Sequence, residues 1–434
     1  MQLTATFSSG TGIIDHNVGA VQSGVPVTVT PSENTTYTLI VTTSDSKTFS
    51  SSTTVLVTGA VCIGSTLMSG LGKTKVMTGF SDGDNDTTTP AAAKWDLSYR
   101  YLSGGLFAGT APCSVCDGSC NASGQFWWGC FDGRAPGQYA LDRFSTNGPI
   151  PWFTYYEILQ SSGAQSIAAE VAAVNNATTS TKILADMKFL FQTIGTRTAF
   201  VHVEPDFWGF AQNAVNSDPT KIPAQVQQFA DCASEPQTLV GFAHCIIAMS
   251  RKYSPNVRIG FHGSTFATGT DISINTNSGL DVAAEAKKLA TFMKALGADA
   301  GDFIAVDASD RDYAYYALVE NDGGAHTWDT TNQKLPTFHQ DFTWAQALAE
   351  NLGLPVFYWQ VPMGNAAQNN TDTHYKDNRV DYFYAHPDEL AAAHVTGMLF
   401  GAGDGHQTNT LTDGGNLIAK EKAYLAAGGQ ALCQ

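Results

Sequence analysis

The sequence predicts a (β/α)8 barrel, in places distorted, preceded by a small β-rich domain, and three observations lead to this fold class. From about residue 62 onward, strand-like and helix-like segments alternate, as they do around a parallel sheet. The strand-like runs number eight, the number that closes a barrel of this type. Residues 1–60 have a different texture, rich in Thr, Ser and Val. We therefore expect an immunoglobulin-like β-sandwich over 1–60 and a (β/α)8 barrel over 61–434.

The first 60 residues contain only four charged residues and neither cysteine nor tryptophan. Short β-rich runs at 25–30, 37–42 and 53–57 are separated by Pro, Ser, Asn and Gly, which is typical of a small antiparallel sandwich. The absence of Cys and Trp excludes the antibody-type core. It also favours a spacer or stabilising role over sugar binding, because no tryptophan can serve as a platform for a sugar ring.

The barrel strands are expected where β-branched, aromatic and apolar residues gather in short runs. These runs are 75–80, 96–102, 151–156, 200–204, 257–262, 303–307, 355–360 and 395–400. Helical periodicity is clear at 183–191 and 282–293, and Gly297 is placed to end the second helix. The first two strands lack a clear helix between them, so a seven-stranded barrel is the alternative.

Composition limits the classes of partner. Only 14% of the residues are charged, and 39 acidic against 23 basic residues give a net charge of −16. Such a chain repels nucleic acid and anionic membranes, whereas a neutral polysaccharide is compatible with it. No apolar run approaches the roughly 18 residues of a membrane span, and the N-terminus does not read as a signal peptide. We expect a secreted monomer whose export signal has been removed.

Eight cysteines, an even number arranged as local pairs, indicate disulfides and therefore an oxidising compartment. We expect Cys62 to pair with Cys433 and Cys232 with Cys245. The other four lie close together in a Gly- and Ser-rich insertion, where disulfides are favoured over zinc because the spacing is not the usual twin Cys-x-x-Cys. They are Cys113, Cys116, Cys120 and Cys130.

The strand at 200–204 ends in the most suggestive segment of the chain. Glu204 and Asp206 flank Pro205, and Trp208 follows. Paired carboxylates beside an aromatic ring suit glycosidic bond cleavage, because one group protonates the leaving oxygen while another activates or supplies the nucleophile. In a barrel, active residues sit at the carboxyl ends of the strands, which is where these residues fall.

A second group of acids, Asp307 and Asp310, follows the strand at 303–307. We predict Glu204 and Asp307 as the working pair, Glu204 being the general acid, with Asp206 and Asp310 tuning their pKa values. The acids after 307 would also suit a calcium loop or surface ion pairs.

Further polar and aromatic residues at strand ends or in the following loops are candidates for contact with sugar. The candidates are Trp208, Trp359, Gln360, His262, Tyr156, Glu157, Asp377 and Arg379. Trp127 and Trp128, inside the cysteine-rich insertion, could also face a substrate groove.

Three segments carry a family resemblance. Val203-Glu-Pro-Asp206 resembles the Glu-Pro-Asp strand end of family 6 glycoside hydrolases, which are secreted cellulases with a distorted barrel and an inverting mechanism. Residues 303–309 look like that family's Phe-Ile-x-Asp-Thr-Ser strand, and 357–364 is similar to its Val-Trp-Ile-Lys-Pro-Gly-Gly segment. The chain departs from the family at 155–159, where Tyr-Tyr-Glu-Ile-Leu replaces Tyr-Asp-x-Pro-x-Arg-Asp. The resemblance implies a polysaccharide hydrolase.

The sequence thus predicts a secreted glycoside hydrolase acting on cellulose or a related β-glucan. Gln360 stands where a retaining enzyme would carry a carboxylate, which favours inversion. One alternative is a metal-dependent hydrolase or deacetylase with His202, Glu204 and Asp206 as ligands. Another is a non-catalytic glycan-binding protein. No cofactor is expected, apart from a structural calcium considered at 82–86.

Overall fold

The computed structural model describes residues 1–16, 18–29, 31, 35–55, 62–83, 86–120, 127–163, 166–215 and 218–432. The chain divides into two compact units, Met1–Cys62 and Ile63–Gln434. Among the described residues, no helix has both the length and the apolar composition needed to cross a membrane.

The first unit consists of two antiparallel sheets, one pairing β1 with β4 and the other ordered β3-β2-β5-β6. Its small core includes Ile14, Val21, Tyr37 and Val55, and in β2 buried side chains alternate with exposed ones. An immunoglobulin-like topology stays a prediction. The strands are β1 Gln2–Thr4, β2 Thr11–Ile14, β3 Gly19–Val21, β4 Pro26–Thr28, β5 Thr35–Thr42 and β6 Thr48–Val55.

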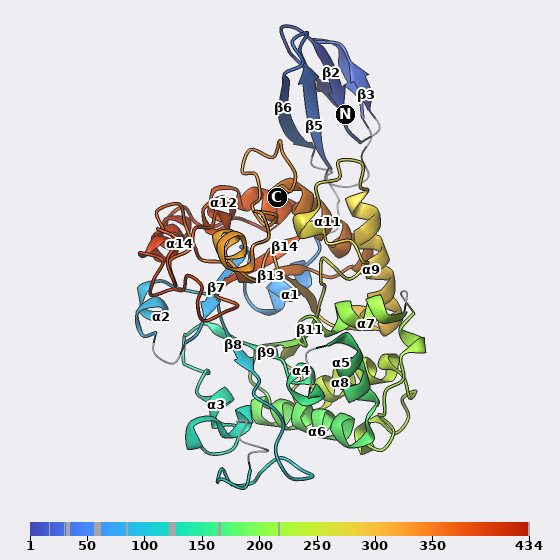
Figure 1. Cartoon of the computed structure of the whole chain (residues 1–434), viewed down its shortest axis with the longest axis vertical. Coiled ribbons are helices and arrows are strands. Elements are labelled where there is room, and N and C mark those ends of the chain that lie inside the picture. Colours follow the sequence, from blue (N-terminus) through green and yellow to red (C-terminus); the bar gives the residue numbers. More distant parts are fainter. Residues whose placement is uncertain are drawn as a thin grey trace. The chain divides into compact units, whose positions relative to one another are not determined.

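The second unit is built on a closed barrel of eight parallel strands, which confirms the predicted barrel (Figure 1). Each strand pairs with its neighbour in chain order, and β14 pairs with β7 to close the ring. A five-residue helix, α2, joins β7 to β8, which explains why no helical period was visible there. The strands are β7 Met77–Ser81, β8 Leu97–Leu102, β9 Ile150–Tyr155, β10 Ala199–Val203, β11 Val257–His262, β12 Phe303–Val306, β13 Val356–Val361 and β14 Val395–Phe400.

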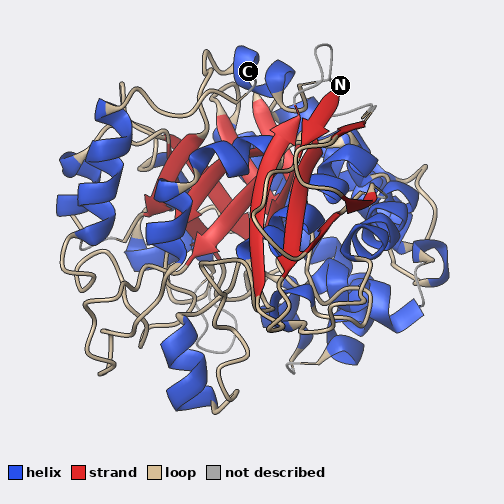
Figure 2. Cartoon of the chain, turned by 90° about the horizontal axis from the view of Figure 1, so that it is seen from above, coloured by secondary structure: helices blue, strands red, loops and turns tan. Residues whose placement is uncertain are grey.

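Helices surround the barrel strands (Figure 2). The periodic segments at 183–191 and 282–293 lie in α6 and α9, and Gly297 ends α9 with a φ of 84°, as predicted. The helices are α1 Ser65–Gly70, α2 Thr88–Ala92, α3 Gln138–Leu141, α4 Ile158–Ser162, α5 Ile167–Asn175, α6 Ala177–Ile194, α7 Phe207–Val215, α8 Leu239–Tyr253, α9 Val282–Leu296, α10 Tyr313–Tyr315, α11 Phe338–Leu352, α12 Arg379–Ala385, α13 Pro387–Ala392 and α14 Asn416–Ala426.

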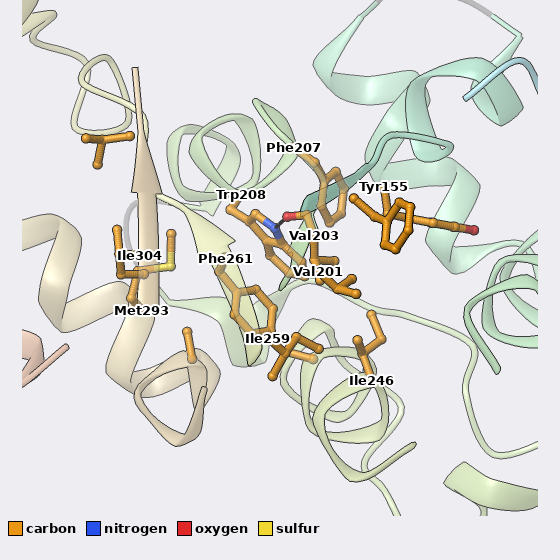
Figure 3. Close-up of a cluster of buried hydrophobic side chains, with 14 of the residues drawn as sticks. Tyr155, Val201, Val203, Phe207, Trp208, Ile246, Ile259, Phe261, Met293 and Ile304 are labelled. Atoms are coloured by element: carbon orange, nitrogen blue, oxygen red, sulfur yellow. Dashed lines mark hydrogen bonds between the residues drawn. The ribbon is translucent and has the colours of Figure 1, made fainter. Parts of the chain in front are cut away.

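Outward-facing strand residues form the layer between barrel and helices. Val201 and Val203 of β10 pack with Phe261 of β11 against Trp208 of α7 (Figure 3). The alternation along β10 therefore sends its valines outward and His202 into the barrel.

Four aromatic rings fill the barrel interior near the amino ends of the strands. The Trp152 ring lies 5.2 Å from Phe200, 4.7 Å from Phe303 and 5.3 Å from Phe357, measured between centroids. All four side chains are fully buried. This aromatic layer closes the barrel from below, so polar interior residues face solvent only at the carboxyl ends of the strands.

Three described disulfides are present. Cys232 pairs with Cys245, as predicted. The cysteine-rich insertion holds the pairs Cys113–Cys120 and Cys116–Cys130, so the disulfide reading of that cluster is confirmed over zinc. Cys433, the predicted partner of Cys62, lies outside the described residues.

The insertion is fastened to the barrel unit through one buried carboxylate. Asp186 of α6 accepts hydrogen bonds from the indole N–H groups of Trp127 at 2.6 Å and Trp128 at 2.8 Å, and from the Tyr155 hydroxyl at 2.9 Å. Both tryptophans are fully buried, so the expected exposure to a substrate groove is not found, although Trp128 lies in the wall of a small cavity at the ends of β7 and β8. Their rings pack in the core because their polar N–H groups have a partner there.

Replacing Asp186 with Ala would leave these three buried donors without their acceptor. We expect a loss of about 3–5 kcal/mol in the free energy of unfolding, measured by urea denaturation. Asp299→Ala, at an exposed position, should change it by less than about 0.5 kcal/mol. Equal stabilities of the two variants would contradict this account of the anchor.

The aromatic rings inside the barrel leave no space for a side chain at Gly260 of β11. A Cβ atom at Gly260 would lie 2.4 Å from the Phe303 ring. We expect Gly260→Ala to destabilise the protein by about 1–3 kcal/mol through overpacking, seen as a lower thermal midpoint. Gly118→Ala, at an exposed position with open space around its Cα, is the control and should leave the midpoint in place.

Candidate active site

Three partly exposed carboxylates meet at the carboxyl ends of the barrel strands. Asp206 follows β10, and Asp307 and Asp310 follow β12. They lie close enough to influence one another's ionisation. The chain bends sharply after β10, where Glu204 has a φ of 51° and Asp206 a φ of 66°. Left-handed backbone is uncommon outside glycine and is often found where a functional side chain must be aimed.

Glu204 does not belong to this group of carboxylates. Its side chain is only 1% exposed, and its Oε1 atom accepts hydrogen bonds from the backbone N–H groups of Glu157 at 2.9 Å and Ile158 at 3.0 Å. Burial raises its pKa well above the usual range. The carboxyl group therefore fixes the start of α4. The predicted role of Glu204 as general acid is wrong, because the group cannot reach a substrate.

Asp206 is the acid that points into the opening. Burial raises its pKa to about 6, and the negative charges of Asp307 and Asp310 add to the rise. The Tyr156 hydroxyl donates to its Oδ2 atom at 3.3 Å, which stabilises the carboxylate and opposes the rise. Asp206 thus titrates near neutral pH, where it can both hold and release a proton.

Asp307 stands at the end of a chain of hydrogen bonds that begins inside the barrel. His262 Nε2 lies 2.8 Å from Asp307 Oδ1, His262 Nδ1 lies 3.1 Å from His202 Nε2, and His202 Nδ1 lies 3.3 Å from Thr154 Oγ1. An ionised Asp307 only accepts, so His262 donates from Nε2, and a neutral His262 accepts at Nδ1 from His202. Burial lowers the pKa of His202, which keeps that ring neutral. His262 therefore orients Asp307 and, at 1% exposure, has little surface for the sugar contact predicted for it.

Asp310 is held from both sides. Tyr316 donates to Oδ1, and Arg311 forms an ion pair with Oδ2. The Tyr316 ring stacks on His326 with centroids 3.6 Å apart. Burial raises the pKa of Asp310, and the charge of Arg311 opposes that rise. Both oxygen atoms are thus engaged by protein groups.

The floor of the opening is aromatic. The Trp359 ring lies 5.4 Å from Tyr101 and 4.8 Å from His202, between centroids, and is nearly buried. Tyr101 donates its hydroxyl hydrogen to Gln360 Oε1, and Gln360 Nε2 donates to the Asp310 carbonyl at 3.3 Å. Of the predicted sugar contacts, Tyr156 is half-buried beside Asp206, whereas Trp359 and Gln360 support the floor.

Four other predicted contacts are structural. Trp208 is fully buried, and its N–H donates to the Val203 carbonyl at 2.8 Å (Figure 3). Glu157 is buried and accepts from the Gly105 N–H at 2.9 Å. Asp377 and Arg379 form a buried ion pair of 2.8 Å, and Asp377 also accepts from the Tyr313 N–H. The prediction that these four residues contact sugar is therefore corrected, because their polar atoms bond to the backbone or to each other.

The residues proposed as alternative metal ligands do not converge. His202 bonds to His262 inside the barrel, and one oxygen of the Glu204 carboxyl is held by backbone amides. Within the described part of the chain, no group of three His, Cys, Asp or Glu side chains is placed to hold a metal ion. The calcium loop considered at 82–86 includes Asp84, which lies outside the described residues.

Three residues of the opening were missed from the sequence: Tyr101, Arg311 and Tyr316. Tyr101 could have been found from the sequence. It lies two residues after Tyr99 in the same strand, so both side chains point to the same, inward face. Arg311 sits between two acids and reads equally well as a surface ion pair. Tyr316 lies in a five-residue π-helical turn, Tyr316–Glu320, and so short a turn cannot be predicted from hydrophobic periodicity.

Comparison with known proteins gives a fold likeness only. No family model and no curated protein matches the chain. A Cellulomonas fimi endo-β-1,4-mannanase of family 26 is similar at 11% identity and a TM-score of 0.44, over 84% of this chain and 73% of that one. A Bacteroides ovatus family 5 xyloglucanase gives 12% identity and 0.43 over 98% and 95%. The cellobiohydrolase Cel6A of Humicola insolens gives 12% and 0.28 over 54% and 58%. These neighbours are glycoside hydrolases, but likeness at this level does not decide what this chain does.

The Tyr156 hydrogen bond can be tested without a substrate. Because this bond stabilises the ionised form of Asp206, we expect Tyr156→Phe to raise the pKa of Asp206 above its value of about 6. Carbon-13 NMR titration of aspartate-labelled protein measures this pKa, with Asp206→Asn identifying the resonance. Tyr253→Phe, which removes a comparable bond to Asp231 at 2.8 Å, should leave the pKa of Asp206 unchanged. An unchanged or lower value in Tyr156→Phe would contradict the assignment.

Proposed function

We propose that this protein is a secreted glycoside hydrolase that cleaves a neutral β-linked polysaccharide, with Asp206 as general acid and Asp307 as base. The observation that carries the proposal is the pair of environments at the barrel opening. Asp206 has a pKa raised to about 6, while a neighbouring aspartate is hydrogen-bonded by histidine. Glycosidic bond cleavage requires two carboxyl groups in different surroundings, one that holds a proton and one that stays ionised.

Asp206 suits the acid role because its proton is retained up to about pH 6 and its side chain is partly exposed. A carboxylic acid with a pKa near the working pH transfers a proton most effectively to a departing oxygen. Tyr156, which donates to the ionised form, would stabilise Asp206 after it has given up the proton.

Asp307 suits the base role better than Asp310. Asp307 is 24% exposed, and among the described residues its only hydrogen bond is to Oδ1, which leaves Oδ2 for a water molecule. Asp310 has both oxygen atoms engaged, by Tyr316 and Arg311. Its charge therefore acts on the other carboxylates through space.

In the proposed reaction, Asp206 gives its proton to the glycosidic oxygen as the bond from that oxygen to the anomeric carbon breaks. Asp307 takes a proton from a water molecule while the water oxygen bonds to the same carbon from the opposite face. One water molecule is consumed and two sugar ends are released. Proton exchange with solvent restores both groups.

Inversion of the anomeric carbon is the expected outcome. Gln360, at the end of β13, presents an amide that is already bonded to Tyr101 and Asp310. It cannot serve as the carboxylate nucleophile of a retaining enzyme. Proton NMR of the first product formed would distinguish the two anomers.

The proposed secretion rests on the three described disulfides, because such bonds persist mainly in oxidising compartments. The barrel contributes the catalytic groups. The first unit, which has little charge, is proposed to act as a spacer.

The test measures release of reducing sugar from β-glucan, xyloglucan, mannan and xylan. We expect Asp206→Asn to lose about 10²–10⁴-fold in kcat on polysaccharide, and to keep more of it on an aryl glycoside whose leaving group needs no proton. Asp307→Asn should lose activity on both substrates. In the unmodified protein, kcat/KM should fall as pH rises through about 6, because Asp206 loses its proton there.

Two variants serve as controls. Glu204→Gln should stay active, because an amide oxygen can still accept from the Glu157 and Ile158 N–H groups. Asp388→Asn, at an exposed position in α13, should match the unmodified protein. Full activity of Asp206→Asn would overturn the acid assignment. Binding of glycan without any release of sugar would favour the non-catalytic alternative.

A further inference from the structure

A separate cavity of 260 Å³ opens beside the carboxylates, at the ends of β7 and β8. We name it the Arg100 pocket, and its lining includes Asp82, Arg100, Tyr101, Ser103, Phe131 and Tyr139. We propose that the Arg100 pocket binds one neutral pyranose ring of the substrate, as a subsite next to the point of cleavage. This inference rests on the proposed function and adds to it the class of sugar that is accepted.

The position of the pocket follows from Tyr101, which forms one of its walls. The Tyr101 hydroxyl donates to Gln360 on the floor of the opening, and its ring centroid lies 6.1 Å from that of Tyr156. Tyr156 in turn donates to Asp206. Two tyrosine rings, Tyr101 and Tyr156, therefore lie between the Arg100 pocket and the proposed general acid.

The polar groups of the pocket are fixed before any ligand arrives. Asp82 accepts from Arg143 at 2.8 Å, and Arg100 Nη2 lies 3.9 Å from the same carboxylate. Arg100 also donates to the Tyr139 hydroxyl at 2.8 Å and lies over the Tyr139 ring. A guanidinium and a carboxylate held at fixed positions offer donors and acceptors for neighbouring sugar hydroxyls without loss of side-chain entropy on binding.

The remaining walls are aromatic. The rings of Phe131 and Tyr139 lie 5.0 Å apart, and because Arg100 covers Tyr139, Phe131 and Tyr101 are the lining rings that a sugar would contact. Aromatic faces pack against the C–H face of a pyranose. The volume lies below the roughly 300–1,000 Å³ of pockets for larger ligands, so one ring is the fitting occupant.

A neutral sugar suits the pocket because the cationic groups beside it, Arg100 and Arg143, are already paired with the Asp82 carboxylate. The Asp82 carboxylate stands in the lining, and the whole chain carries a net charge of −16. A uronic acid or sulfated sugar would bring a further negative charge next to Asp82.

The test measures binding of cello-oligosaccharides of two to six glucose units to the Asp206→Asn protein by calorimetry. One step in this series should raise affinity sharply, because the added ring enters the pocket. When Asp82→Asn or Phe131→Ala is added, the affinity for chains long enough to reach the pocket should fall by about tenfold or more. The affinity for shorter chains should stay the same. Asp132→Asn, an exposed neighbour outside this pocket, should leave the series unchanged.

Two results would separate the possible failures. If the unmodified protein hydrolyses β-glucan and all variants give the same affinity series, the pocket is not a subsite and the proposed function stands. If the unmodified protein releases no sugar and Asp206→Asn binds no oligosaccharide, both proposals fall. A crystal of Asp206→Asn soaked with cellotetraose should show one ring between Asp82 and Phe131, and this holds even if one pocket variant does not fold.

Discussion

The aromatic layer at the base of the barrel is the constraint on which the site depends. Trp152, Phe200, Phe303 and Phe357 occupy the interior near the amino ends of the strands and are fully buried there. Gly260 provides the space for the Phe303 ring. Every polar side chain that points into the barrel must therefore find a protein partner or reach the carboxyl end, and the histidine chain that ends at Asp307 does both.

Crowding of acids in a partly desolvated opening gives the site its chemistry. Asp206 is the one of the three carboxylates that is hydrogen-bonded only by a phenol, and burial and its acidic neighbours raise its pKa to about 6. Asp307 and Asp310 are stabilised by histidine and by arginine, respectively. The roles thus differ because the partners differ, although all three residues are aspartates.

The strands and the site were not equally predictable. Alternation along 200–204 correctly placed the valines outside and His202 inside, and the same rule located all eight strands. The rule cannot distinguish Glu204 from Asp206, because it assumes extended backbone, and both residues adopt positive φ values after β10. Trp208 was misassigned because its neighbours in sequence are acidic, whereas its neighbours in space are Val203 and Phe261.

The anchoring of the cysteine-rich insertion has a consequence for how such a barrel could diversify. Its two disulfides are internal, so the loop is covalently self-contained. Its attachment, however, relies on Asp186, which belongs to a helix far along the chain. Transplanting the loop onto a related scaffold would require carrying that aspartate with it. A scaffold without an acceptor at that helix position would leave three buried donors unpaired.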